Sequence, residues 1–87
     1  MDIVQRKNLA LSKVAFKLVE DRLPEDDSEL IRGYIYDHNE WGLGMEHIVD
    51  ALLEEDISVT RVQRDSIVEA MEAMNLERSQ HKLRIAE

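Results

Sequence analysis

The sequence predicts a small all-α protein, a single-domain bundle of about four helices with a short C-terminal tail, spanning residues 1–87. The chain has only three glycines and one proline, the residues that interrupt helices most strongly. Apolar residues recur at helical spacing in four segments, which capping and turn residues separate. With 87 residues and 44% apolar residues, the chain can form one modest core but not two.

The first helix is expected to begin near Asp2 or Ile3, because Asp2 and Gln5 have the spacing of a capping box. It should end at Leu23-Pro24, since the residue before a proline avoids the helical conformation. A 3, 1, 3, 1 spacing predicts its apolar face as Leu11, Val14, Ala15, Leu18 and Val19.

A short second helix is expected after the capping residues 25–28, ending between Tyr36 and His38. Its predicted apolar face consists of Leu30, Ile31, Tyr34 and Ile35. Asn39 is the candidate N-cap of a third helix that continues to about Asp56. The predicted apolar face of this helix consists of Trp41, Met45, Ile48, Val49, Leu52 and Leu53.

Gly42 and Gly44 interrupt the pattern of the third helix. Each costs about 1 kcal/mol relative to alanine in a helix interior. We interpret them as places where the first or second helix approaches closely, in preference to a functional role.

The fourth helix is expected to start at Thr60, which forms a capping box with Gln63. Its predicted buried residues are Val62, Ile67, Ala70, Met71 and Met74. Asn75 is the expected left-handed stop, and the tail from Leu76 to Glu87 is expected to dock as a short helix or strand, or to fray.

The sequence contains no motif that predicts catalysis or a bound cofactor. It has no cysteine, no glycine-rich phosphate loop and no Gly-x-Ser-x-Gly turn. His47 and Asp50 are three residues apart, but no further residue completes a metal-ligand pattern. We therefore expect a protein that is not an enzyme, with no catalytic residue, metal or cofactor.

We also expect a cytoplasmic protein. No stretch is long and apolar enough for a membrane span, and the first residues have no apolar core typical of a secretory signal. The absence of cysteine fits a reducing compartment.

Negative charge is concentrated in the middle of the chain. The net charge is −8, and residues 24–60 carry eleven acidic residues against one base, Arg32. Such a field repels phosphate backbones, which argues against direct nucleic-acid binding, and attracts a basic protein. The alternative is an acidic, solvated surface that only keeps the protein soluble.

Acidic side chains line one side and the C-terminal end of the third helix: Glu46, Asp50, Glu54, Glu55 and Asp56. Acids near a helix C-terminus are unfavourable by roughly 0.3–1 kcal/mol each when exposed. A local cost without a local gain indicates an external partner. The alternative is that Arg61, Arg64 or a lysine of the first helix neutralises the stripe.

Three of the four aromatic residues fall between Tyr34 and Trp41. Tyr34 and Trp41 match core positions, whereas Tyr36 lies off the apolar face and is the better candidate for an interface contact. The predicted partner-binding set is therefore Tyr36, Asp37, Glu40, Glu46, Asp50, Glu54, Glu55 and Asp56.

The stretch Tyr34-Ile-Tyr-Asp-His-Asn-Glu-Trp-Gly-Leu-Gly-Met-Glu, followed by Leu52-Leu-Glu-Glu-Asp-Ile-Ser-Val-Thr, resembles the MafI-type immunity proteins of bacterial polymorphic and contact-dependent toxin systems. Members have an Asp-His-x-Glu-aromatic-Gly-Leu-Ala turn, an amphipathic helix with an acidic end, an Ile-x-Ile/Val link and a final helix. The resemblance covers about residues 28–74, and Gly44 stands where the family usually has alanine. It implies an antitoxin-like protein that binds and neutralises one cognate toxin domain, and it assigns no binding residues.

Two hypotheses follow. The first is an immunity protein that binds the C-terminal domain of a cognate toxin, with a basic nuclease as the favoured class, through its acidic surface; reversal of Glu46, Asp50 and Glu54 to lysine should then slow association. The second is a helical adaptor or homodimerisation module unrelated to toxins, in which Met45, Met71 and Met74 line an adaptable groove. The sequence leaves open the toxin, whether its active site or a neighbouring site is covered, and the oligomeric state.

Overall fold

Four α-helices and three short helical turns form the part of the chain that the structure, a computed structural model, describes: residues 1–86. The elements are α1 (Ile3–Val19), η1 (Glu20–Arg22), α2 (Glu25–Arg32), η2 (Gly33–Asp37), α3 (Trp41–Glu54), α4 (Arg61–Ala73) and η3 (Gln80–Lys82). The turns η1 and η3 are 3₁₀-helical, and η2 is π-helical. The predicted all-α class is confirmed.

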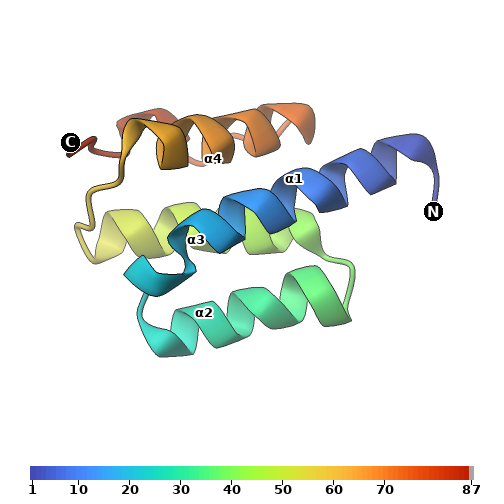
Figure 1. The fold of residues 1–87 in the computed structure, drawn as a ribbon, viewed down its shortest axis with the longest axis horizontal. Helices are drawn as coiled ribbons and strands as arrows, with labels where there is room; N and C mark the ends of the chain where they lie inside the picture. The colour runs from blue at the N-terminus through green and yellow to red at the C-terminus, as the bar shows by residue number, and fades with distance from the viewer. Residues whose placement is uncertain (87) are drawn as a thin grey trace.

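The helices lie side by side, with α3 at the centre (Figure 1). α1 packs against α3 and α4, and α2 packs against α3. The N-terminal end of α1 and the last described residues of the tail lie at opposite ends of the long axis (Figure 1). α3 also packs against α4, and within α3 the side chains of Leu43 and Glu54 stay exposed.

The buried apolar side chains form one core, to which α3 contributes Met45, Ile48, Val49, Ala51 and Leu52. In α1 the predicted apolar face is partly wrong. Val14 and Leu18 are exposed, whereas Phe16 is almost completely buried. α1 packs against two helices, so its buried face is rotated toward Ser12 and Phe16. Ser12 tolerates burial because its hydroxyl donates to the carbonyl of Leu9 at 2.8 Å.

Two further apolar residues that the sequence pattern predicts as buried are exposed in the structure. Leu30 of α2 is 46% exposed and Val62 of α4 is 66% exposed. Both lie on the outer sides of their helices. The buried face of α2 contains Ile31, and that of α4 contains Ile67 and Ala70.

The turn before α3 differs from the prediction. Asn39 does not cap α3: the N-cap position is Glu40, and no side chain bonds to the helix start there. Asn39 instead adopts a left-handed conformation (φ 53°), which asparagine tolerates better than most residues. The π-helical turn η2 comes just before it, and the Glu40 amide donates to the Tyr34 carbonyl at 2.7 Å to close the reversal.

Gly44 confirms the predicted close approach, and Gly42 does not. A Cβ at Gly44 would lie 2.7 Å from Cγ1 of Ile35, a buried residue of η2. A Cβ at Gly42 would meet the Leu76 side chain at an ordinary 3.7 Å. The neighbour at Gly44 is the π-helical turn that follows α2.

The two predicted capping boxes, Asp2 with Gln5 and Thr60 with Gln63, are both present. Asn75 ends α4 in a left-handed conformation (φ 56°), as predicted. The tail docks as the turn η3 and, through Ile85, forms a parallel bridge to Val59.

Candidate interaction surface

The predicted acidic stripe divides into paired and unpaired carboxylates. Asp50 accepts from Nε of Arg78, with 3.3 Å to each carboxylate oxygen. Asp56 forms an ion pair with Nη2 of Arg84 at 3.1 Å. Both arginines belong to the tail, so these two carboxylates hold the tail against the rest of the fold.

The expected neutralising bases differ from those observed. Arg64 pairs with Asp65 at 3.9 Å, and Lys17 of α1 pairs with Glu20 at 3.5 Å. Arg78 and Arg84 each lie 28 residues from their acidic partners, and no local spacing in the sequence links them.

Three acidic side chains of α3 and its C-cap have no ion pair or hydrogen bond anywhere in residues 1–86: Glu46, Glu54 and Glu55. We call them the unpaired acids. Glu54 and Glu55 are exposed at the C-terminal end of α3, whose last turn holds no basic residue. Their charges therefore face the negative end of the helix dipole with no compensating cation in the described part of the chain.

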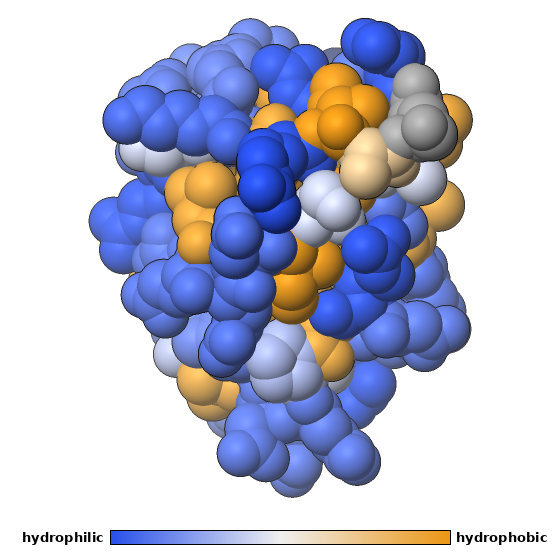
Figure 2. Space-filling view, turned by 90° about the vertical axis from the view of Figure 1, so that its left-hand side faces the viewer, coloured by the Kyte–Doolittle hydropathy of each residue, from blue (hydrophilic) through white to orange (hydrophobic). Residues whose placement is uncertain are grey.

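The end of the molecule where α3 stops and α2 starts faces the viewer in Figure 2. Hydrophilic side chains cover most of this surface, and the apolar patches between them are small. Glu25 and Asp26 in the first turn of α2 add to the negative charge of this end. There the helix dipole favours them, so their presence needs no partner to explain it.

The ring contacts of Tyr36 are with α1. Its ring packs edge-on against Phe16 of α1 at 6.5 Å, and Nζ of Lys13 lies 5.1 Å above it. Tyr36 is 42% exposed and lines an open hollow of about 450 Å³ together with Phe16, Lys17, Glu20, Arg32 and Asp37. The predicted contact residues therefore lie on different elements: Tyr36 and Asp37 line a hollow beside α1, and Glu40 is the N-cap residue of α3.

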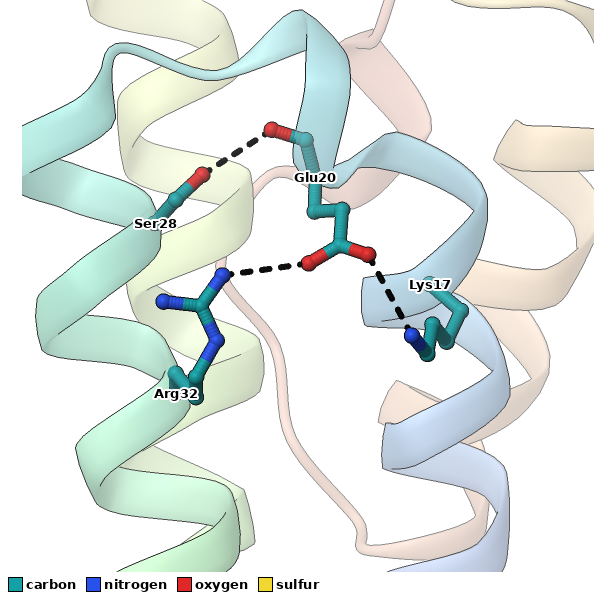
Figure 3. Close-up of polar contacts among 4 residues, drawn as sticks. All are labelled: Lys17, Glu20, Ser28 and Arg32. Atoms are coloured by element: carbon teal, nitrogen blue, oxygen red, sulfur yellow. Dashed lines mark hydrogen bonds and ion pairs between the residues drawn. The ribbon is translucent and has the colours of Figure 1, made fainter.

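Glu20 joins α1 to α2 (Figure 3). Its carboxylate pairs with Lys17 at 3.5 Å and with Arg32 at 3.2 Å, and its carbonyl accepts from the Ser28 hydroxyl at 3.0 Å. Because Arg32 is the one base of residues 24–60, this pairing leaves the other acids of α2 without a cation on their own helix.

His47 joins α3 to α2. Its Nε2 lies 2.8 Å from Oδ1 of Asp27, and its ring is 6.3 Å from that of Tyr34. Both side chains are half-buried, which is typical of a structural contact. Within residues 1–86, no cluster of three or more histidine, cysteine or acidic residues could hold a metal ion.

Sequence reasoning missed an open groove on the outer side of α2. We call it the α2 groove; its volume is about 570 Å³, and it is lined by Asp26, Glu29, Leu30, Gly33, Tyr34 and His38. The first five have the 3, 1, 3, 1 spacing that places residues on one side of a helix, and this spacing is visible in the sequence. The groove was not predicted, because the sequence pattern placed Leu30 and Tyr34 in the core.

No known family model, curated protein or solved structure matches this chain. Among the helices that the structure describes, none combines the length and the apolar character needed to cross a membrane.

Proposed function

We propose that this protein is a cytoplasmic, non-enzymatic immunity protein that binds a basic toxin domain, a nuclease being the favoured class, and neutralises it. The single observation that carries the proposal is the set of unpaired acids on α3 and its C-cap. They have no cationic partner in residues 1–86, whereas Asp50 and Asp56 are paired with arginines of the tail. The resemblance of residues 28–74 to MafI-type immunity proteins supplies the toxin as the partner class.

The unpaired acids suit such a partner for a physical reason. A nuclease domain must bind phosphates, so its active-site region is commonly basic. Exposed carboxylates attract that region over a distance and raise the association rate, and in the complex they take the place of phosphates or bind beside the cleft. At the C-terminal end of α3 a cationic partner also relieves the unfavourable helix dipole.

The test uses two triple variants of equal charge change. The first reverses the unpaired acids, Glu46→Lys, Glu54→Lys and Glu55→Lys. The control reverses three α4 and tail acids that have no ion pair in the described residues, Glu69→Lys, Glu72→Lys and Glu77→Lys. Asp50 is left unchanged because its loss would release Arg78, and the effect on the tail would be confused with an effect on binding.

Each variant is co-expressed with the product of the gene immediately upstream, which the proposal expects to be a secreted protein with a variable C-terminal domain, and growth and association rate are measured. The first variant should lose protection and associate more slowly, most clearly at low salt, whereas the control should protect. If the first variant protects cells as fully as the control does at native expression level, the acidic-surface mechanism is refuted.

A homodimerisation or adaptor module is the second candidate, and a different surface favours it. The methionine groove expected for it is absent, because Met45 and Met71 are fully buried. The outer side of α1, however, exposes Ile3 by 81% and Val14 by 54%. Sedimentation separates the candidates: a concentration-dependent dimer that Val14→Asp abolishes favours the module, and a monomer that pairs one to one with the neighbouring gene product favours immunity.

A further inference from the structure

The α2 groove owes its depth to a missing side chain. Gly33 has helical backbone angles (φ −58°, ψ −45°), and a Cβ built on it would meet no atom within 4 Å. Neither a close neighbour nor a left-handed conformation therefore requires glycine at this position, although glycine costs about 1 kcal/mol relative to alanine in a helix. This open space lies between Leu30 and Tyr34 along the outer side of α2.

The groove combines apolar surface with carboxylates. Leu30, which lines the groove, is 46% exposed, and the half-buried Tyr34 lies with its ring 6.3 Å from that of His47 in α3. Asp26 and Glu29 line the same groove and have no ion pair or hydrogen bond with any other part of residues 1–86. The helix dipole favours Asp26 in the first turn, but Glu29 gains nothing comparable in the middle of the helix.

Among residues 1–86, no lysine or arginine lines the groove, and His38 is its one basic side chain. Arg32, the one base of α2, points to the other side of the helix, where it pairs with Glu20 at 3.2 Å and lies over the Phe16 ring at 5.6 Å. The groove therefore presents two carboxylates, the His38 imidazole, an aliphatic side chain and an aromatic side chain, and neither carboxylate is paired with a cation in residues 1–86.

We propose that the α2 groove binds an arginine side chain presented by a basic protein partner. The aliphatic stem of the arginine would lie over Gly33, between Leu30 and Tyr34, and its guanidinium would pair with Glu29 and Asp26. Arginine suits this chemistry because its stem covers apolar surface while its charged head stays polar, and because its planar head pairs with carboxylates and stacks on aromatic rings.

The identity of that partner as a toxin rests on the proposed function, but the chemistry of the groove does not. The site also extends the contact region beyond the expected residues, none of which lines it. Tyr34 lies beside His47, the neighbour of Glu46, so an arginine in the groove and a cation at Glu46 could belong to one basic partner surface.

The direct test uses N-acetyl-arginine amide as the probe, with N-acetyl-citrulline amide as a neutral control of the same shape. Amide chemical shifts are followed by NMR during titration of the wild type, Gly33→Leu, Glu29→Gln and a control, Glu69→Gln. Gly33→Leu fills the groove without changing its charge, and the open space at Gly33 should let the variant fold. Glu29→Gln removes one charge without filling the groove, so a folding failure of the first variant would still leave a test.

In the wild type and in Glu69→Gln, the arginine probe should shift the amides of Leu30, Gly33 and Tyr34 in a saturable way. Citrulline should shift them far less. Gly33→Leu and Glu29→Gln should each weaken binding about tenfold or more, the scale of a lost interface contact. Shifts spread evenly over all the acidic surface, or unchanged in both groove variants, would overturn the proposal.

The same variants separate this inference from the proposed function. If the probe binds in the groove but the upstream-encoded protein is never neutralised, the proposed function fails and the groove stands. If the probe ignores the groove and Gly33→Leu protects cells as fully as the wild type, the groove fails and the proposed function stands.

Discussion

The same substitution should have opposite effects at two glycines of the helical framework. Gly33→Ala places a methyl group in open space, whereas Gly44→Ala places one 2.7 Å from Cγ1 and 3.2 Å from Cδ1 of Ile35. Carbon atoms pack favourably at about 3.5–4.0 Å, so the contact at Gly44 is too short by about 1 Å. Ile35 is completely buried, and its Cγ1 atom lies next to the backbone, so it cannot easily move away.

The two free-energy effects differ in size. Alanine gains about 1 kcal/mol over glycine in a helix at either site. At Gly44, overpacking costs about 1–3 kcal/mol, so we expect a net loss of up to about 2 kcal/mol. For a chain of this size, about 1 kcal/mol shifts Tm by about 4–8 °C. Gly33→Ala should therefore raise Tm by several degrees, and Gly44→Ala should lower it by up to about 15 °C.

Thermal and urea unfolding, followed by circular dichroism, measures the stability of both variants and of the wild type under the same conditions. Gly33→Ala serves as the matched control, since it has the same gain in helix propensity without the contact. A Gly44→Ala protein stabilised as much as Gly33→Ala would refute the packing of α3 on η2, because the short contact would then cost nothing. It would also mean that this turn accepts the alanine usual in MafI-type proteins, contrary to the structure.

Three further substitutions test other parts of the structure by urea unfolding. Gln80→Ala should cost about 1–3 kcal/mol, because the buried Gln80 side chain bonds the Arg78 amide at 2.7 Å and the Leu76 carbonyl at 3.0 Å; a neutral effect would mean that the tail does not dock. Thr60→Ala should cost about 1 kcal/mol through loss of the α4 cap, and an unchanged midpoint would contradict the capping box. Glu54→Lys should raise stability by roughly 0.3–1 kcal/mol while slowing partner association, and parallel losses of stability and binding would show that Glu54 is structural.

Local sequence signals predicted some helix boundaries and missed others. α1 was expected to continue to Leu23-Pro24 but ends at Val19, where the 3₁₀ turn η1 follows. Residues 25–28 were expected as caps of the second helix, but α2 already begins at Glu25, with Pro24 at its N-cap and no side-chain cap.

The capping boxes at Asp2 and Thr60 and the left-handed stop at Asn75 depend on residues at most three apart, and all three are present. Asn39 shows the limit of such signals. Asparagine suits both an N-cap and a left-handed turn, and the π-helical turn before it favours the second.

Packing between helices was harder to predict. Periodicity shows that α1 is amphipathic, but which rotation is buried depends on the two helices that α1 contacts. The predicted stripe through Val14 and the observed one through Phe16 are adjacent on the helix surface and share Ala15 and Val19. Val62 is exposed for a related reason, because α4 packs through Ile67 and Ala70.

The candidate surface was predicted only in part. The concentration of acids on α3 was visible in the sequence, but their division into paired and unpaired carboxylates depends on Arg78 and Arg84, which the tail places 28 residues from their partners. The ring contacts of Tyr36 with α1 were not predicted. The α2 groove needed the structure, since an open space at Gly33 cannot be recognised from spacing alone.

Hydrogen–deuterium exchange of the complex with the upstream-encoded protein tests the central claim most directly, because it reports which side of the molecule is covered. We predict slower exchange in residues 29–34 of α2 and η2 and in residues 50–56 at the end of α3. Slower exchange confined to α1, with both of those segments unchanged from the free protein, would contradict the claim that carboxylates hold the partner.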